Sequence, residues 1–354
     1  MLLSLAALLS VLWWCDMANF HWLYVGNWTA LTKSGYGLGT YDPYNPLDLP
    51  PFTVRFQFNN LSQGYDPTTS GETWKSDATW TQVSSSPNVW DYHRADPNWT
   101  GEFEGNTWGI YTNSYASILG MNTTGITTMT RMLSRIKFME PIPSFDISGT
   151  TTLYGLFENS SFLGTREDHL PMLNTSHITS MDSVFTSCNF GNTSIHRTGY
   201  PMPDWDVSHV TSMYAMFRNT GIYGVLPGAI RIPSSWHTSS LTNMNYMFSD
   251  AIVFGLSNLD TSHVTSFNNT FCRGYYGEQT DTIYPIDTSS ARDVTKMYYN
   301  MADIQYGMYE MYQQLSANTN ITNHSECFAL TGTALPLGQA ARAQIPTSWG
   351  GDQS

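Results

Sequence analysis

Residues 204–217 have the sequence DWDVSHVTSMYAMF, and this stretch decides the fold. Val210, Met213, Met216 and Phe217 are apolar and are spaced i, i+3, i+6 and i+7. This spacing covers one face of about two helical turns, so it predicts a short amphipathic helix. The serine two positions before Val210 is a suitable helix N-cap. Because a helix of two turns is too short to be stable alone in water, neighbouring structure must hold it.

The same pattern recurs along the chain at residues 126–133, 178–185, 210–217, 241–248, 264–271 and 294–301, with a degraded seventh copy at 150–157. Successive copies end 23 to 32 residues apart. Each copy can bury its apolar face only by stacking on the next one. The sequence therefore predicts an α+β solenoid of about seven repeats over residues 119–301, each repeat a short strand followed by a short helix.

The predicted core of these repeats consists of Met129, Leu153, Met181, Phe185, Met213, Phe217, Met244, Phe248, Phe267, Phe271 and Met297. Trp205 and Trp236 precede their copies at a position that is usually large and apolar, so we expect both in the core as well.

An acidic or amide residue lies four positions before the first apolar residue of most copies, as at Asn122, Asp146, Asn174, Asp206 and Asp260. Asp287 takes this place before 294–301 if three extra residues are inserted. A residue that recurs once per copy is typical of a turn or a helix N-terminus that needs a hydrogen-bond acceptor. We therefore assign these side chains to architecture and not to the carboxylate pair of a glycosidase.

The region before the repeats has a different character. Residues 52–58 alternate apolar and polar side chains, which predicts a half-buried strand, and we expect a β-rich unit over residues 51–118. Residues 1–50 form an irregular lead-in. Residues 1–16 are either a signal peptide or an incorrectly assigned extension upstream of a translation start at Met17. Cys15 leaves a lipoprotein as a lesser alternative. Residues 302–354 are predicted to be a helical or irregular C-terminal cap.

Composition excludes several functions. The formal net charge is −13, from 15 basic and 28 acidic residues, and such a chain is a poor match for the phosphate backbone of nucleic acid. It is equally unsuited to anionic lipid, and no apolar run is long enough for a membrane span. Motifs for nucleotide cofactors and zinc hydrolysis are absent from the sequence, so we expect no cofactor and no enzymatic activity.

Three sets of side chains contain residue types that can bind metal ions, form disulfides or act as acids and bases. His177, His209 and His263 share one repeat position, but stacked repeats are too far apart for shared zinc ligands, so no metal site is expected. Cys188 and Cys272 are expected to be small buried residues and not disulfide partners. Glu102 and Glu104 flank Phe103, and we expect them on a solvated strand face.

The repeat resembles the BspA-type leucine-rich-like repeat of bacterial surface proteins, the DUF285 family, with residues 204–217 as the best copy. The flanking segments at 41–51, 119–127, 312–315 and 343–350 resemble a subgroup from gut bacteria and their phages. The resemblance implies a leucine-rich-repeat-like fold and a non-catalytic surface or adhesion role.

We therefore expect a non-enzymatic extracellular recognition or adhesion protein on a bacterial cell or phage particle. The alternative is a structural virion component, such as a fibre or decoration subunit, with the solenoid as a spacer. Partners would be a host cell-surface protein or glycan, or other virion proteins. Chain length varies most at 186–204, 218–235 and 272–285, and such insertions map to one face of a solenoid. The candidate binding residues there are Tyr200, Tyr223, Tyr275, Tyr276, Arg197 and Arg273.

Overall fold

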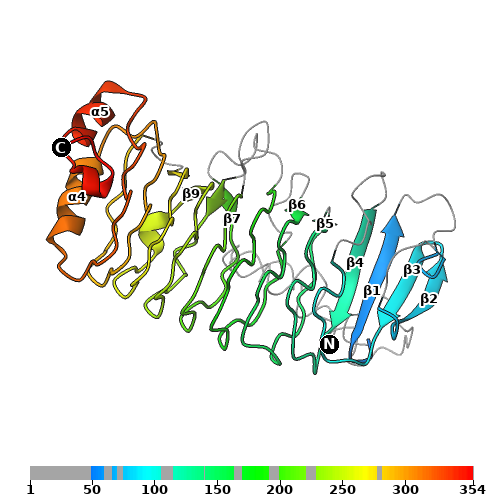
Figure 1. Cartoon of the computed structure of the whole chain (residues 1–354). Helices are drawn as coiled ribbons and strands as arrows, with labels where there is room; N and C mark the ends of the chain where they lie inside the picture. The colour runs from blue at the N-terminus through cyan, green and yellow to red at the C-terminus, as the bar shows by residue number, and fades with distance from the viewer. Residues whose placement is uncertain are drawn as a thin grey trace, which may run out of the picture. The chain divides into compact units, whose positions relative to one another are not determined.

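The computed structural model describes residues 49–59, 66–69, 75–104, 115–138, 140–162, 170–190, 199–220, 229–276 and 281–353. All of them belong to one compact unit, Tyr44–Ser354. An antiparallel sheet begins this unit, short parallel strands occupy its middle, and two helices lie near its C-terminal end (Figure 1).

The antiparallel sheet consists of β1 (Thr53–Asn59), β2 (Thr79–Ser85), β3 (Asn88–His93) and β4 (Tyr115–Asn122), in the order β2-β3-β1-β4. In β1, Val54, Phe56 and Phe58 are all buried, so the predicted strand is confirmed. It is not half-buried as predicted, because Thr53 and Arg55 are buried as well in this inner strand of the sheet. The strand β4 ends at Asn122, which extends the sheet past the predicted boundary at 118 and into the first repeat.

Six short strands follow, one in each of six successive connections: β5 (Lys137–Phe138), β6 (Ser161–Phe162), β7 (Tyr200–Pro201), β8 (Ile230–Arg231), β9 (Ile252–Phe254) and β10 (Tyr275–Tyr276). They pair in parallel as β5-β6 and β10-β9-β8-β7. The helices of the described residues are α4 (Met308–Ala317) and α5 (Pro336–Arg342). The same residues include the 3-10 turns η3 (Leu256–Asn258) and η4 (Thr347–Trp349).

The repeated segments are series of β-turns, so the prediction of a short helix in each copy is wrong. In the copy at 210–217, the N–H of Met216 donates to the carbonyl of Met213 at 3.2 Å, which closes a single turn. The N–H of Met213 instead donates to Asn243 O at 3.1 Å, and that of Phe217 donates to Met247 O at 3.0 Å. A helix would keep these bonds within itself. Here alternate N–H groups join each copy to the next, and we call these bonds the turn ladder.

The backbone of each copy turns left-handed twice, five and nine positions after its first apolar residue. Positive φ angles occur at Arg131, Arg135, Gly155, Asn159, Ser183, Ser187, Ala215, Asn219, Tyr246, Asp250, Asn269, Arg273, Lys296, Asn300, Glu326 and Leu330. Gly, Asn and Asp tolerate this conformation best. A regular α-helix cannot contain such residues at this period.

One predicted copy is in the wrong register. Asp293 forms a parallel bridge with Ser266, and Ser266 forms one with Asn243, so these residues occupy the same position in successive copies. The copy therefore spans 291–298 instead of 294–301, and it ends at Tyr298. Asp287 lies four residues before position 291, as in the other copies, so the proposed three-residue insertion does not exist.

The turn ladder extends beyond the predicted limits of 119–301. Asp293 also bridges Asn323, which adds a copy at 321–328 inside the segment predicted to be only a cap. At the other end, Asn98 bridges Thr128, and the N–H of Phe103 donates to Met132 O at 3.0 Å. Residues 96–103 are therefore a further copy within the region predicted to be only β-rich.

Aromatic rings at the last position of the copies form one continuous column in the core. Centroids of successive rings are 5.4–5.9 Å apart and their planes differ by 2–12°, in the order Phe157, Phe185, Phe217, Phe248, Phe271, Tyr298 and Phe328. All eleven residues of the predicted core are at most 1% exposed, and so are Trp205 and Trp236. Each copy thus buries its apolar positions against its two neighbours.

The recurrent acid or amide accepts a hydrogen bond from the backbone two residues later. Asp206 Oδ1 accepts the N–H of Ser208 at 3.0 Å, so that serine sits in this turn and caps no helix. The same bond is made by Asn122, Asp146, Asn174, Asp260 and Asp287. The predicted turn role of these side chains is confirmed.

Candidate functional site

The predicted binding residues do not form one exposed cluster. Tyr200 is only 1% exposed, and its ring lies 4.9 Å from that of Phe190. It cannot contact a ligand from this position, because its place in β7 directs the side chain into the core. The prediction of Tyr200 as a binding residue is therefore wrong.

The other predicted residues divide into two groups. Tyr275 and Tyr276 form β10, and Arg273 lies just before them, with a side chain 53% exposed that pairs with Asp250 at 2.6 Å. Arg197 and Tyr223 lie outside the described residues, as do the central parts of the three variable connections.

Exposed aromatic and basic side chains instead gather on the outward positions of the turn ladder. We call this set the turn face: Arg131, Tyr154, Tyr214, Arg218, Tyr246, Arg273, Lys296 and Tyr299. These residues alternate with the buried apolar positions of the same copies. Of these residues only Arg273 was predicted to bind, because the repeated segments were expected to lie in the core. The signal was available, since Tyr and basic residues recur four, five, eight and nine positions after the first apolar residue.

Contacts within a copy and between neighbouring copies order the turn face. The guanidinium of Arg218 lies 5.0 Å from the centroid of the Tyr246 ring, and Lys296 Nζ lies 5.2 Å from that of Tyr299. The rings of Tyr214 and Tyr246 are 5.7 Å apart. Cation–π and edge-to-face contacts of this kind hold large side chains in place at the surface. The turn face therefore presents aromatic rings in fixed positions.

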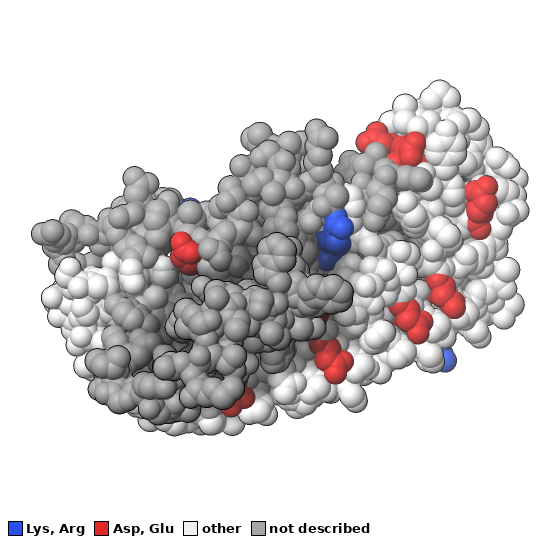
Figure 2. All heavy atoms as spheres, turned by 180° about the vertical axis from the view of Figure 1, so that it is seen from behind, with Lys and Arg blue, Asp and Glu red and all other residues white. Residues whose placement is uncertain are grey.

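Ion pairs neutralise most of the positive charge on the turn face. Arg131 pairs with Glu158 at 2.6 Å, Arg273 with Asp250 at 2.6 Å, and Lys296 with Glu326 at 3.4 Å. Acidic side chains lie singly among uncharged ones over the described part of the molecular face in Figure 2. Neither these ion pairs nor the described residues seen in Figure 2 indicate a basic stripe of the kind that binds along a phosphate backbone.

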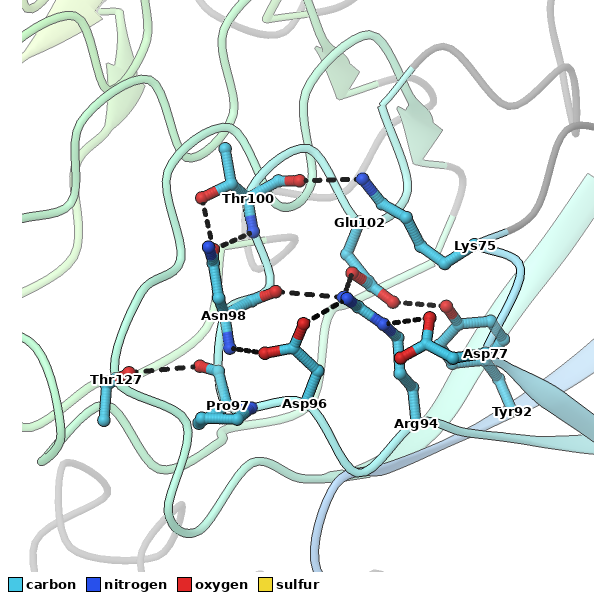
Figure 3. A network of polar contacts seen from close by, with 10 residues as sticks. All are labelled: Lys75, Asp77, Tyr92, Arg94, Asp96, Pro97, Asn98, Thr100, Glu102 and Thr127. Carbon is cyan, nitrogen blue, oxygen red and sulfur yellow. Dashed lines mark hydrogen bonds and ion pairs between the residues drawn. The ribbon is translucent and has the colours of Figure 1, made fainter.

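A second group of ionisable residues lies beside the antiparallel sheet, with Arg94 and Glu102 buried and Asp77 and Asp96 partly exposed (Figure 3). Arg94 lies at its centre and pairs with Glu102 at 2.7 Å, with Asp77 at 2.7 Å and with Asp96 at 2.5 Å. The side chain of Glu102 is 0% exposed, and its other oxygen accepts the hydroxyl of Tyr92. The prediction that Glu102 lies on a solvated strand face is wrong, because this residue occupies the buried i+6 position of the copy at 96–103.

Burial shifts the protonation equilibria of this group. Burial raises the pKa of Glu102 above its ordinary value, although the bonds from Tyr92 and Arg94 act in the opposite direction. Burial also raises the pKa of Tyr92, and the adjacent Glu102 raises it further. The hydrogen bond from Arg94 lowers the pKa of Asp77. Both oxygens of Glu102 are engaged and covered, so it is not available to a substrate as a general acid or base.

This group closes one end of the turn ladder. The carbonyls of Asn98 and Thr100 occupy positions that, in later copies, accept N–H groups from the preceding copy. Here Arg94 Nη1 donates to Asn98 O at 2.9 Å and Lys75 Nζ donates to Thr100 O at 3.1 Å. Two cationic side chains thus replace the backbone donors of a preceding copy.

The histidines of the shared repeat position make separate local contacts. His177 Nε2 lies 3.0 Å from Ile147 O, while His209 and His263 lie 3.1 Å and 3.0 Å from the hydroxyls of Ser208 and Ser262. In the described part of the chain no three His, Cys, Asp or Glu side chains are placed to hold a metal ion. The absence of a metal site remains a prediction for the whole chain.

The described cysteines Cys188, Cys272 and Cys327 are buried free thiols. The thiol of Cys188 donates to Phe157 O at 2.9 Å, and burial raises its pKa. A buried thiol with a raised pKa is unreactive, so these cysteines serve packing. The described ranges contain no helix long and apolar enough to cross a bilayer.

The fold and the turn face define a repeat protein whose copies are joined backbone to backbone and whose outward positions carry aromatic and basic side chains. The family described as "Mycoplasma protein of unknown function, DUF285" matches the chain over residues 103–221, 163–271 and 228–329, and the chain belongs to this family. These matches cover the turn ladder from the end of its first copy, at residue 103, through its last copy, at 321–328. No curated protein and no solved structure matches the chain.

Proposed function

We propose that the chain is a leucine-rich-repeat-like solenoid of the BspA type. Three features support a quasi-one-dimensional stack in which each copy contacts its neighbours. They are the turn ladder, the column of stacked rings, and the turn that an acid or amide side chain closes just before most copies, as Asp206 does. Such stacks present long, rigid faces.

The proposed function is non-enzymatic recognition or adhesion outside the cell, on the surface of a bacterium or a phage particle. The observation that carries it is the turn face, where Tyr154 and Tyr214 are 38% and 36% exposed. Tyr154 lies beside the guanidinium of Arg131, and Tyr214 packs against the ring of Tyr246. Tyrosine with arginine is typical of binding hot spots, because it supplies a large contact area at a small entropic cost. The buried ionisable group at Arg94 is engaged in closing the ladder, which favours binding over catalysis.

An attachment assay tests this proposal. Labelled protein is incubated with candidate host bacteria, and the wild type is compared with the double variant Tyr214→Ala and Tyr246→Ala. Tyr306→Ala is the matched control, since Tyr306 is 51% exposed and lies outside the turn face. We expect the double variant to lose at least tenfold in attachment and the control to lose less than twofold.

Two outcomes would contradict the proposal. Equal attachment by the double variant and the wild type would exclude the turn face as the binding surface. If the wild type attaches to no candidate host and the protein copurifies in fixed stoichiometry with virions, the solenoid is a structural spacer of the particle. Proteomics of purified particles against host envelope supplies that second measurement.

A further inference from the structure

Arg218 differs from the other basic residues of the turn face. Arg131, Arg273 and Lys296 each have a carboxylate from a neighbouring copy within ion-pair distance. Among the described residues, Arg218 has no carboxylate partner, and its Nε is buried without a hydrogen-bond acceptor. The one interaction that places it is the contact with the ring of Tyr246, 5.0 Å from guanidinium carbon to ring centroid.

Two acids of the adjoining copies already have partners. Asp250, in the next copy, is held by two bonds from Arg273, at 2.6 Å and 2.7 Å. Asp182, in the preceding copy, uses Oδ1 to accept the hydroxyl of Ser212 at 2.5 Å and the N–H of Tyr214 at 2.8 Å. The guanidinium of Arg218 therefore keeps a full positive charge that no side chain of the described copies neutralises.

Aromatic rings adjoin this cation. Tyr214, 36% exposed, packs its ring 5.7 Å from that of Tyr246 at an angle of 63°, and Tyr246 also lies beneath Arg218. The side-chain amide of Asn219, next to Arg218 in the chain, donates to Ser187 Oγ at 3.4 Å, so hydroxyl and amide groups border the pair. The contacts of the described residues at this point thus combine two tyrosine rings with an amide and a hydroxyl group.

We propose that Tyr214, Arg218 and Tyr246 form a subsite for a carboxylated sugar unit of a glycan, such as a uronate or a sialate. The carboxylate would contact the two Nη groups of Arg218 end-on, because Nε is covered. The C–H face of the sugar ring would pack on the Tyr214 ring, and its hydroxyls would meet the neighbouring polar groups. This inference rests on the proposed recognition function and names its ligand class.

The surroundings favour a sugar over an acidic peptide. Protein interfaces have a desolvated apolar centre. The large apolar side chains exposed in the described part of the chain are Tyr154, Met172, Tyr214, Tyr306, Leu330 and Leu337, and of these only Tyr214 belongs to the subsite. A pyranose ring needs no aliphatic partner, since one aromatic face and several hydroxyl or amide groups suffice.

Titration calorimetry with defined probes tests the subsite. The full chain is titrated with 3′-sialyllactose and with trigalacturonate, and lactose and maltotriose serve as the neutral counterparts. We expect at least one carboxylated probe to bind at least tenfold more tightly than its neutral counterpart. We expect Arg218→Gln to abolish this preference at unchanged melting temperature. Arg135→Gln is the matched control, because Arg135 lies outside the turn face with its side chain 59% exposed and its charge paired with Glu104 at 3.7 Å, and it should change the affinity less than twofold.

Three results would overturn the inference. They are equal binding of neutral and carboxylated sugars, no binding of either acidic sugar, or tighter binding of a tetra-aspartate peptide than of the acidic sugars. Host attachment separates this failure from that of the proposed function. If Arg218→Gln attaches like the wild type while the tyrosine double variant does not, recognition stands and the acidic-sugar subsite falls. If the wild type attaches to no host, the proposed function itself fails.

Discussion

Replacing Phe217 with alanine tests whether the ring column holds the copies together. Phe217 is 0% exposed, and its ring stacks on Phe185 at 5.6 Å and on Phe248 at 5.9 Å. Deleting a buried Phe side chain costs about 3–5 kcal/mol. Each aromatic pair is worth about 0.5–1.5 kcal/mol beyond its buried area. Because two stacked pairs are lost together, we expect a loss in the upper half of that range, about 4–5 kcal/mol in the free energy of unfolding.

Equilibrium unfolding in urea measures this loss. Tryptophan fluorescence and far-ultraviolet circular dichroism should be followed together, because coincident transitions justify a two-state free energy. Tyr214→Ala is the matched control, since Tyr214 lies three residues away in the same copy but is 36% exposed. We expect it to cost less than about 1 kcal/mol. A cost below about 1 kcal/mol for Phe217→Ala would refute the assignment of the column as the principal contact between copies.

Four further predictions follow from the contacts described. Arg94→Met should destabilise the protein by about 3–5 kcal/mol in urea unfolding, because it leaves Glu102 buried without its cation; adding Glu102→Leu should recover much of this loss, and no recovery would contradict the charge argument. The hydroxyl and the N–H of Ser208 lower the pKa of Asp206 in the folded protein. The stability that this bond contributes is therefore fully present above the pKa of the unfolded chain, about 4, and is lost as the pH falls through the lower pKa of the folded protein. Asp206→Asn should thus flatten the fall in melting temperature at acid pH, and an unchanged fall would contradict the role of Asp206 in the turn. Deleting residues 302–354 should expose the Tyr298 ring, now covered by Phe328 at 5.5 Å, and should lower solubility and melting temperature; a soluble, equally stable product would show that the last copy is dispensable. Addition of a chelator should leave the melting temperature unchanged, and a clear drop would reveal a metal site.

The sequence predicts the core of the repeats well because burial depends on spacing alone. Met213 and Phe217 are buried whether the segment is a helix or a series of turns, since both conformations return to the same side every three to four residues. The local conformation is different, because it depends on where each N–H bonds. Asn219 and Gly155, which favour positive φ, were a signal for turns, as was the high content of Thr and Ser, which are weak helix formers.

One error came from the period of the pattern. Apolar residues three apart look alike when a copy is shifted by three, so Val294 was taken for the first position when Ala291 holds it. The column of rings resolves the register, because only Tyr298 lies in line with Phe271 at 5.4 Å. Tyr200 was misplaced for another reason: composition marked its segment as a loop, while pairing with β8 turns the residue inward.

The polarity of the turn ladder explains why its two ends are closed by different chemistry. The N–H groups of the turn ladder point to the copy that follows, although those of Thr211 and Thr242 point back to the preceding copy. Among the described copies, the first therefore presents ladder carbonyls that no preceding copy covers, and the last presents ladder N–H groups that no following copy accepts. Arg94 and Lys75, which only donate, cover carbonyls at the first end. The carbonyl of Trp349, which only accepts, takes the N–H of Phe328 at 2.9 Å at the other end. Because exposed ladder edges invite pairing between chains, these contacts disfavour end-to-end association. The lateral surface, where the turn face lies, is then the surface left open for the proposed recognition.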